Sequence, residues 1–351
     1  MQFVPFNSVI FANQETKFVN TEYITMDLLT PMKFHPIFKD KIWGGTKIKD
    51  ILHYNFSPLA NCGELWAISG VKGNESVVSE GPLEGNTLNE VLEIFMSELV
   101  GESVFEKFEN QFPLLIKYLD AQDWLSIQVH PDDELAQIRG LDQGKTEMWY
   151  ILQADKNAQL ISGFKKAVSK ENFKQKVENN TITELLNYEN VEAGDAFYMP
   201  SGRVHSLGPG ILLAEIQQSS DTTYRIYDWD RKDEQGKSRK LHIDDSLDAI
   251  DYKIAKDYKV DFQEANNQSV PIVDEQYFTT NILTFDAAIE KDYDELDSFV
   301  IYMVIEGSFQ LKHPDGFMDL GIGDTVLIPA ITKKLELHPT PKAKILEIYI
   351  K

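Results

Sequence analysis

The sequence predicts an all-β protein with helical insertions, organised as two jelly-roll β-barrels. Three observations predict this class. Short apolar runs bounded by Gly and Pro recur along most of the chain, as in GELWAIS (63–69) and GDTVLIP (323–329). Helical periodicity is confined to two stretches, and one β unit is present twice. Many short strands separated by turns favour a jelly roll over a fold of alternating strands and helices.

The internal repeat consists of two pairs of similar segments. EMWYILQAD (147–155) resembles SFVIYMVIEG (298–307), and GDAFYMPSG (194–202) resembles GDTVLIPAI (323–331). The spacing between the paired segments is longer in the first copy by about the length of a helical stretch at 165–188. We therefore expect one β unit to occur twice, with helices inserted into the first copy.

The two helical stretches have recognisable starts. In residues 87–109, Thr87 and Glu90 form a capping box ahead of apolar residues at helical spacing, and Gly101 is expected to divide the stretch into two helices. Residues 165–188 fit two short helices, with Ser169 and either Thr181 or Thr183 as caps.

The pattern also predicts the domain boundaries. Residues 1–31 lack motif and periodicity and are expected to form a dispensable N-terminal arm. Residues 32–250 would form the first β domain, with helical insertions near 87–109 and 165–188. A strongly charged stretch, 230–260, precedes the second β domain at 251–351.

Composition excludes several classes of protein. The 56 acidic and 34 basic residues give a net charge of −22, which disfavours nucleic acid and anionic membranes as partners. The 42% hydrophobic content excludes global disorder. A single cysteine, Cys62, excludes an intramolecular disulfide, and no apolar run approaches a membrane span. The N-terminus lacks the early positive charge of a secretory signal, so we expect a cytoplasmic protein.

The pattern Gly194-x5-Pro200-x-Gly202-x2-His205 is the first candidate for a metal site. Glycine and proline shape the turns on either side of a strand, and His205 begins the returning strand. This frame resembles the second half-motif of the cupin superfamily, in which that histidine binds a metal. A histidine satisfied by hydrogen bonds is the alternative, which the complete frame disfavours.

Further candidate ligands precede His205. Gln128 and His130 are two residues apart on an expected strand and therefore point to the same face. Glu147 opens another strand. Each segment alone also fits a polar strand end. Together the four side chains offer two imidazoles, a carboxylate and an amide oxygen, a set that suits zinc and also iron, manganese or cobalt.

The C-terminal copy of the repeat lacks these ligands. Lys334 matches His205, and approximately Phe299 matches Glu147. We therefore expect one metal site, with the second barrel degenerate.

Two basic residues lie within apolar or aromatic stretches of the sequence. Arg225 follows a polar run and lies among aromatic residues, where it either pairs with Asp221 or Asp228 or stabilises an oxyanion or a phosphate. Lys117 lies inside the apolar run PLLIKYLD, and it either reaches solvent or contacts a phosphate.

At these residues the sequence resembles the type I phosphomannose isomerases, in their short bacterial form. The resemblance rests on six segments: IWGG (42–45), GELWAIS (63–69), FPLLIKYLDAQDWLSIQVHPDD (112–133), GKTEMWY (144–150), PSGRVHSLGPG (200–210) and EIQQSSDTTYRIYDWDR (215–231). It spans roughly 35–231, and the C-terminal third matches only as a degenerate cupin.

The resemblance implies one zinc ion per chain, with Gln128, His130, Glu147 and His205 on the family's ligand positions. It also implies a catalytic role for Arg225. Glu215 and Lys145 lie at active-site positions of the family motif. Lys117 and Ser69 are assigned to substrate binding.

The implied reaction interconverts mannose 6-phosphate and fructose 6-phosphate by proton transfer through an enediol. Glu215, Lys145 and a metal-bound water are the candidates for the general base. Two other functions stay open: a metal-dependent isomerase or epimerase of another sugar or sugar phosphate, and a non-catalytic cupin that senses a sugar.

Overall fold

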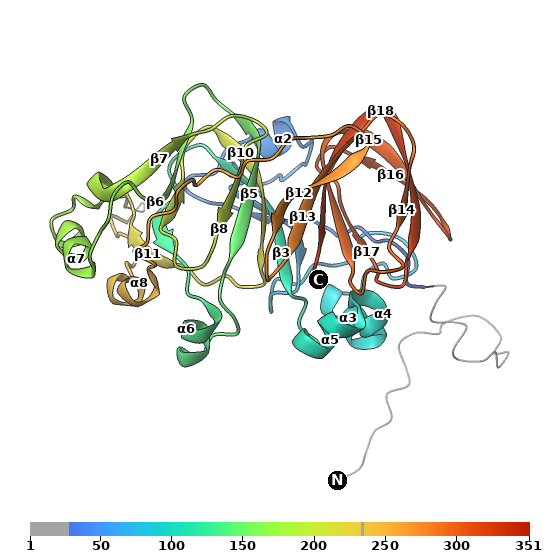
Figure 1. Cartoon of the computed structure of the whole chain (residues 1–351), viewed down its shortest axis with the longest axis horizontal. Helices are drawn as coiled ribbons and strands as arrows, with labels where there is room; N and C mark the ends of the chain where they lie inside the picture. The colour runs from blue at the N-terminus through green and yellow to red at the C-terminus, as the bar shows by residue number, and fades with distance from the viewer. Residues whose placement is uncertain (1–27, 233–234) are drawn as a thin grey trace, which may run out of the picture.

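The computed structural model describes residues 28–232 and 235–351. The first β body contains two antiparallel sheets (Figure 1). The six-stranded sheet has the order β1 (Ile37–Lys39), β2 (Glu64–Ser69), β3 (Leu114–Ala121), β10 (Ile211–Gln218), β5 (Glu147–Ala154) and β8 (Ala196–Met199). The five-stranded sheet has the order β11 (Tyr224–Tyr227), β4 (Ile127–Val129), β9 (His205–Leu207), β6 (Gln159–Phe164) and β7 (Leu186–Asn190).

The second β body lies beside the first (Figure 1). Its sheet has the order β12 (Gln268–Asp274), β13 (Thr279–Phe285), β18 (Lys334–Tyr349), β15 (Val300–His313) and β16 (Gly316–Gly321). Two further strands join it, β14 (Ile289–Asp292) on β18 and β17 (Thr325–Ile328) on β15. The predicted class, all-β with helical insertions and two cupin-like jelly-roll barrels, is confirmed.

Strand β10 (ILLAEIQQ) shows how the sequence places the core. All eight of its residues are buried. Leu212 and Ile216 face a core shared with residues of the second body such as Ile301 and Leu346. Leu213, on the opposite face, packs inside the first barrel. Because successive side chains of a strand alternate between faces, Glu215 and Gln217 also point into the first barrel.

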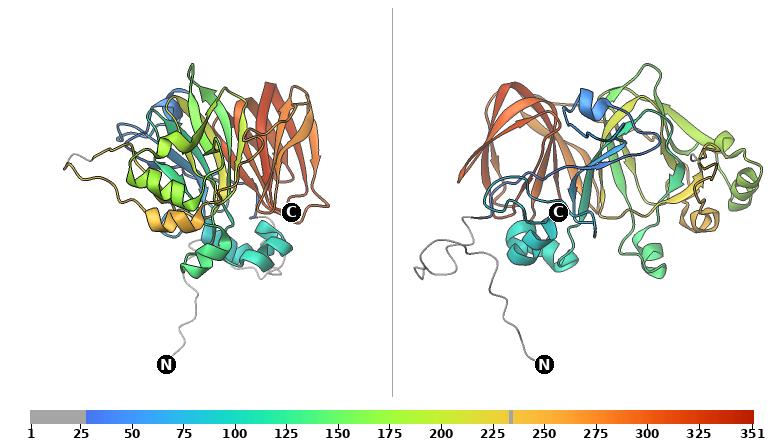
Figure 2. Two further views of the ribbon diagram at one scale, coloured as in Figure 1. Left: turned by 60° about the vertical axis from the view of Figure 1, so that its left-hand side comes forward. Right: turned by 180° about the vertical axis from the view of Figure 1, so that it is seen from behind.

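The helical insertions are short. The first contains α3 (Leu88–Phe95), α4 (Ser97–Val100) and α5 (Glu102–Phe108), and the second contains α7 (Lys170–Glu178) and the 3-10 turn η1 (Ile182–Leu185). The remaining helices are α2 (Lys47–Asp50), α6 (Asp133–Ile138) and α8 (Ile243–Ala249). Figure 2 shows α3–α5 beneath the second body. No helix in the described part of the chain is long and apolar enough to cross a membrane.

The expected caps are largely present. The Thr87–Glu90 capping box is formed, and Ser169 caps α7 by accepting a hydrogen bond from Asn172 N at 3.1 Å. The stretch 87–109 forms three helices rather than two, because the chain breaks at Met96, with φ 46°, as well as at Gly101. Thr181 precedes η1 without a side-chain cap bond.

Both copies of the repeat contain the same backbone hydrogen bond, and its position corrects one of the residue matches expected from the sequence. Gly194 N donates to Ile151 O at 2.9 Å, and Gly323 N donates to Val304 O at 2.8 Å. This equivalence makes the buried Val300, one residue beyond Phe299, the counterpart of Glu147.

The described end of the N-terminal arm packs on the second body. Leu29 and Met32 are buried, and Met32 exchanges backbone hydrogen bonds with Leu327 at 2.9 and 3.0 Å. Residues 1–27 of the predicted arm lie outside the described residues.

Candidate metal centre

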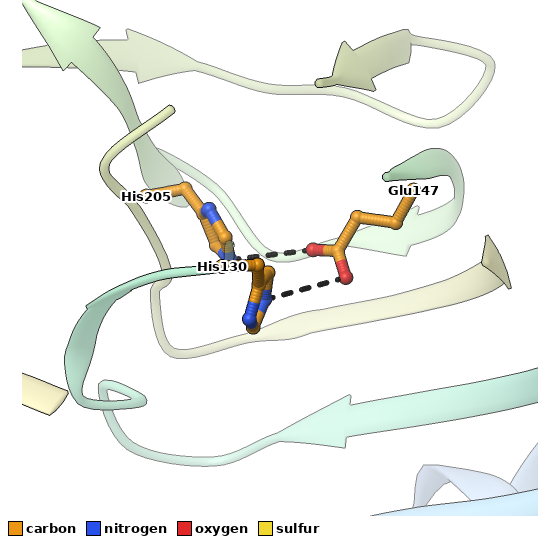
Figure 3. A group of neighbouring side chains, drawn as sticks. All are labelled: His130, Glu147 and His205. Carbon is orange, nitrogen blue, oxygen red and sulfur yellow. Dashed lines mark ion pairs between the residues drawn. The ribbon is translucent and has the colours of Figure 1, made fainter. Parts of the chain in front are cut away.

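Three candidate ligands meet inside the first barrel (Figure 3). His130 follows β4, Glu147 begins β5 and His205 begins β9. Their ligand atoms all lie within 4.8 Å of one another, and all three residues are buried. The Nε2 atoms of His205 and His130 lie 3.3 and 3.6 Å from the Glu147 carboxylate oxygens. Among residues 28–232 and 235–351, no other His, Cys, Asp or Glu group of three is as compact.

Backbone carbonyls orient both imidazole rings. His130 Nδ1 lies 2.9 Å from Thr222 O, and His205 Nδ1 lies 2.9 Å from Arg203 O. An Nδ1–H that donates to a carbonyl leaves the Nε2 lone pair free for a metal. Burial lowers the pKa of both histidines, and Lys145 adds to this effect at His130. Both rings are therefore held in the neutral form that a metal requires.

The surroundings of the Glu147 carboxylate indicate whether a metal ion fits among the three candidate ligands. Both of its oxygens are buried without a hydrogen bond of normal geometry, although Lys145 Nζ lies 2.9 Å from Oε2. A buried carboxylate is costly unless cations or donors compensate it. Two neutral imidazoles and a carboxylate with accepting capacity to spare fit a divalent cation in both charge and donor chemistry.

Gln128 and Arg225 extend the centre across the five-stranded sheet. Gln128 pairs with His205 on β9 on one side and with Arg225 on β11 on the other. Gln128 Nε2 lies 3.3 Å from His205 Nε2, so a half-turn of the amide would direct its oxygen to the same place. Arg225 donates from Nη1 to Lys240 O at 3.0 Å, while its buried Nε has no partner.

Lys117 and Glu215 form a buried ion pair in the same barrel. Lys117 Nζ lies 3.1 Å from Glu215 Oε1 and donates to Gln217 Oε1 at 2.7 Å. Burial alone would raise the pKa of Glu215, but Lys117 and Lys145 outweigh it and hold that pKa below its ordinary value. Glu215 is therefore a carboxylate at neutral pH.

Ser69 lies at the end of β2, apart from the ligand cluster. Its hydroxyl accepts a hydrogen bond from Val71 N at 3.2 Å, and its backbone N–H donates to Ser76 Oγ at 2.9 Å. Its expected contact with substrate stays a prediction.

A basic segment beside Arg225 was missed in the sequence analysis. Asp228 accepts hydrogen bonds from Arg231 Nη2 at 2.6 Å and from Arg239 Nε at 2.7 Å. Both guanidinium groups act electrostatically on Arg225. The signal available in the sequence was a cluster of bases at 225–240 in a chain that is otherwise strongly acidic.

Comparison with known proteins identifies the family. Residues 32–157 match the model of the type I phosphomannose isomerase catalytic domain. The chain is 37% identical over 304 residues to the probable mannose-6-phosphate isomerase GmuF of Bacillus subtilis, covering 86% of this chain and 93% of that protein. The chain belongs to the type I phosphomannose isomerase family.

Other members of the family, and proteins of the same fold, extend the match. The Streptococcus mutans mannose-6-phosphate isomerase is 47% identical over 210 residues, which are 60% of this chain and 64% of that one. The crystal structure of a Bacillus subtilis mannose 6-phosphate isomerase matches with a TM-score of 0.82 at 36% identity, over 92% of this chain and all of that one. A zinc-bound mannose 6-phosphate isomerase, 15% identical with a TM-score of 0.74, covers 92% of this chain and all of its own and shares the fold.

Proposed function

We propose that the chain interconverts D-mannose 6-phosphate and D-fructose 6-phosphate, with one zinc ion per chain. The observation that carries this proposal is the buried cluster of His130, Glu147 and His205, whose ligand atoms face one another. The names of its relatives, mannose-6-phosphate isomerases matched over most of their length, support the substrate.

The proposed ligands are His130, Glu147, His205 and the amide oxygen of Gln128. When bound there, a divalent ion would supply Lewis-acid polarisation of the O1/O2 pair of the open-chain sugar. The residues of the chain itself carry the remaining steps.

Proton transfer is assigned to Glu215. Of the two side-chain candidates for the base, Lys145 lies against the ligand carboxylate of Glu147, whereas Glu215 does not contact the ligand set. Glu215 takes the proton from C2 of mannose 6-phosphate and returns it to C1, while a hydroxyl proton passes from O2 to O1. The enediol is the intermediate between these two transfers. Arg225 stabilises the negative charge that develops on the sugar oxygens and remains cationic throughout.

The phosphate group needs cations in a chain of net charge −22. The resemblance assigns Lys117 and Ser69 to substrate binding. Arg231 and Arg239 add two guanidinium groups beside Arg225, which pair with the carboxylates of Asp228 and Asp123. We propose that Arg231 and Arg239 also contribute to phosphate binding.

The test is a coupled assay for fructose 6-phosphate formed from mannose 6-phosphate, with and without a metal chelator. We expect turnover in the untreated enzyme, loss on chelation and recovery on addition of zinc. Unphosphorylated mannose serves as the control substrate and should react far more slowly. Turnover that survives complete metal removal, or preference for the neutral sugar, would contradict the proposal.

A further inference from the structure

A single row of buried side chains crosses the six-stranded sheet inside the first barrel. Trp66 on β2 lies opposite Lys117 on β3, Lys117 opposite Glu215 on β10, and Glu215 opposite Trp149 on β5. Residues directly opposite one another in an antiparallel sheet project to the same face. All four side chains are therefore neighbours on the face that holds the metal centre.

The row fixes both oxygens of Glu215. Lys117 Nζ lies 3.1 Å from Oε1, and Trp149 Nε1 donates to Oε2 at 2.9 Å. A carboxylate held at both oxygens by strands of the same sheet cannot rotate freely about its last bond. Charge-assisted hydrogen bonds of this kind are also stronger than neutral ones.

Trp149 also touches the metal centre. Its ring meets the His205 imidazole edge-on, with centroids 5.4 Å apart and an interplanar angle of 87°. One buried side chain thus contacts the proposed base through its N–H group and a proposed ligand through its ring.

We propose that Trp149 is a positioning residue of the isomerisation, whose indole N–H holds the Glu215 carboxylate at a fixed place relative to the metal centre. The inference rests on the proposed function. Displacement of a reacting group by about 1 Å can cost up to about 100-fold in rate. Loss of one donor from Glu215 is therefore expected to lower turnover even though substrate binding is unaffected.

The row also provides a matched comparison. At its far end Trp66 Nε1 donates to Glu64 Oε2 at 2.7 Å, and Lys41 Nζ lies 3.0 Å from the other oxygen of Glu64. Trp66→Phe therefore removes the same kind of hydrogen bond from a different carboxylate. Any general effect of shrinking a buried indole should appear in both variants.

The experiment compares Trp149→Phe with Trp66→Phe in the metal-loaded enzyme. We expect Trp149→Phe to lower kcat by about tenfold or more, with KM within about threefold and metal content unchanged. Trp66→Phe should lower kcat by less than about threefold.

The pH profile separates positioning from a merely structural role. The titratable groups around Glu215 are Lys117, Lys145, Glu64 and the neutral His205, and Trp149→Phe leaves all of them in place. Because the indole N–H helps to keep the pKa of Glu215 low, the acid limb of kcat/KM should move to higher pH in Trp149→Phe. In the Glu215→Gln background, Trp149→Phe should cost no further activity.

A second measurement needs no change at Trp149. In protein labelled with ¹⁵N-tryptophan, Glu215→Gln should shift one of the five indole N–H signals clearly more than the others. Equal losses in the two Trp→Phe variants, or five unmoved indole signals, would overturn the inference while an active wild type upholds the proposed function. A metal-loaded wild type without isomerase turnover would overturn both.

Discussion

Arg225 on β11 lies directly opposite Gln128 on β4, and Gln128 lies opposite His205 on β9. Opposite residues share a face of the sheet, so the proposed charge-stabilising guanidinium and two proposed ligands occupy one side of the five-stranded sheet. Arg225 nevertheless bonds to Lys240 O and not to a ligand atom. Its contribution to turnover should therefore be separable from metal binding.

Arg225→Ala should lower kcat by roughly 10²–10³-fold, because loss of one donor to a developing oxyanion typically costs this much. Metal content should stay at the wild-type level. Steady-state kinetics and elemental analysis of the same preparation would check this. Arg139→Ala provides the matched control, since Arg139 pairs with Asp245 and Asp248 on α8. A near-normal kcat in Arg225→Ala would reduce Arg225 to a structural role.

His205→Ala should lose the metal and remain folded, because the apolar cores of both barrels do not depend on the ion. Elemental analysis should give about one divalent ion per wild-type chain and far less in the variant. Circular dichroism should show the same β content in both. His338→Ala, which changes a partly exposed histidine on β18, should keep the ion. Two ions per wild-type chain would contradict the single-site prediction.

Removal of residues 1–25 should leave activity and melting temperature nearly unchanged, because that segment holds no motif. Removal of residues 1–33 should destabilise the protein, because it also deletes the buried Leu29 and Met32. Loss of two buried apolar side chains typically costs about 3–5 kcal/mol. Thermal unfolding of both truncations would measure the difference. Equal melting temperatures would show that the 28–33 segment adds nothing to stability.

The Glu64 carboxyl should make the free energy of unfolding depend on pH in the acid range. Burial by itself would raise its pKa, but Lys117, Lys41 and the Trp66 N–H lower it to about 2. A carboxyl whose pKa falls on folding stabilises the protein above its unfolded pKa of 4.5, and this stabilisation is lost as pH falls towards 2. The loss amounts to about 3 kcal/mol at most.

Urea unfolding of wild type and Glu64→Gln between pH 2 and 6 would measure this contribution. The free-energy difference between the two proteins should shrink as pH falls from about 5 to 2. A difference that stays constant over this range would show that the Glu64 carboxyl has the same pKa in the folded and unfolded chains.

The second barrel should contribute stability but no ligands. Lys334, the counterpart of His205, is exposed and pairs with Asp292 and Asp294 on the surface. Lys334→Ala should therefore leave metal content and kcat/KM within about threefold of wild type, since surface changes usually shift energies by less than ~0.5 kcal/mol. A strong rise in KM for the sugar phosphate alone would instead place the phosphate site in the second barrel.

Truncation near residue 260 should have a much larger effect. It would remove residues such as Ile301 and Leu346, which share a core with Leu212 and Ile216 of β10. We expect insoluble protein, measured as the soluble fraction after expression. A soluble, active fragment would show that the first barrel folds alone.

The sequence by itself predicted the fold class, the repeat and the capped starts of the helical insertions. These features depend on local patterns: alternation along strands, Gly and Pro at turns, and side chains that cap nearby N–H groups. It also predicted a ligand set from the frame around His205 and from the same-face spacing of Gln128 and His130. Local geometry fixes these relationships wherever the strands finally pack.

Only the tertiary structure decided how distant residues meet. The register of β2, β3, β10 and β5 places Trp149 against Glu215 and encloses Lys117 between Glu215 and Trp66, and no local pattern specifies that register. The repeat register likewise moved the counterpart of Glu147 from Phe299 to Val300. A shift of one residue exchanges the two faces of a strand, and only the packed barrels determine which face is buried against which neighbour.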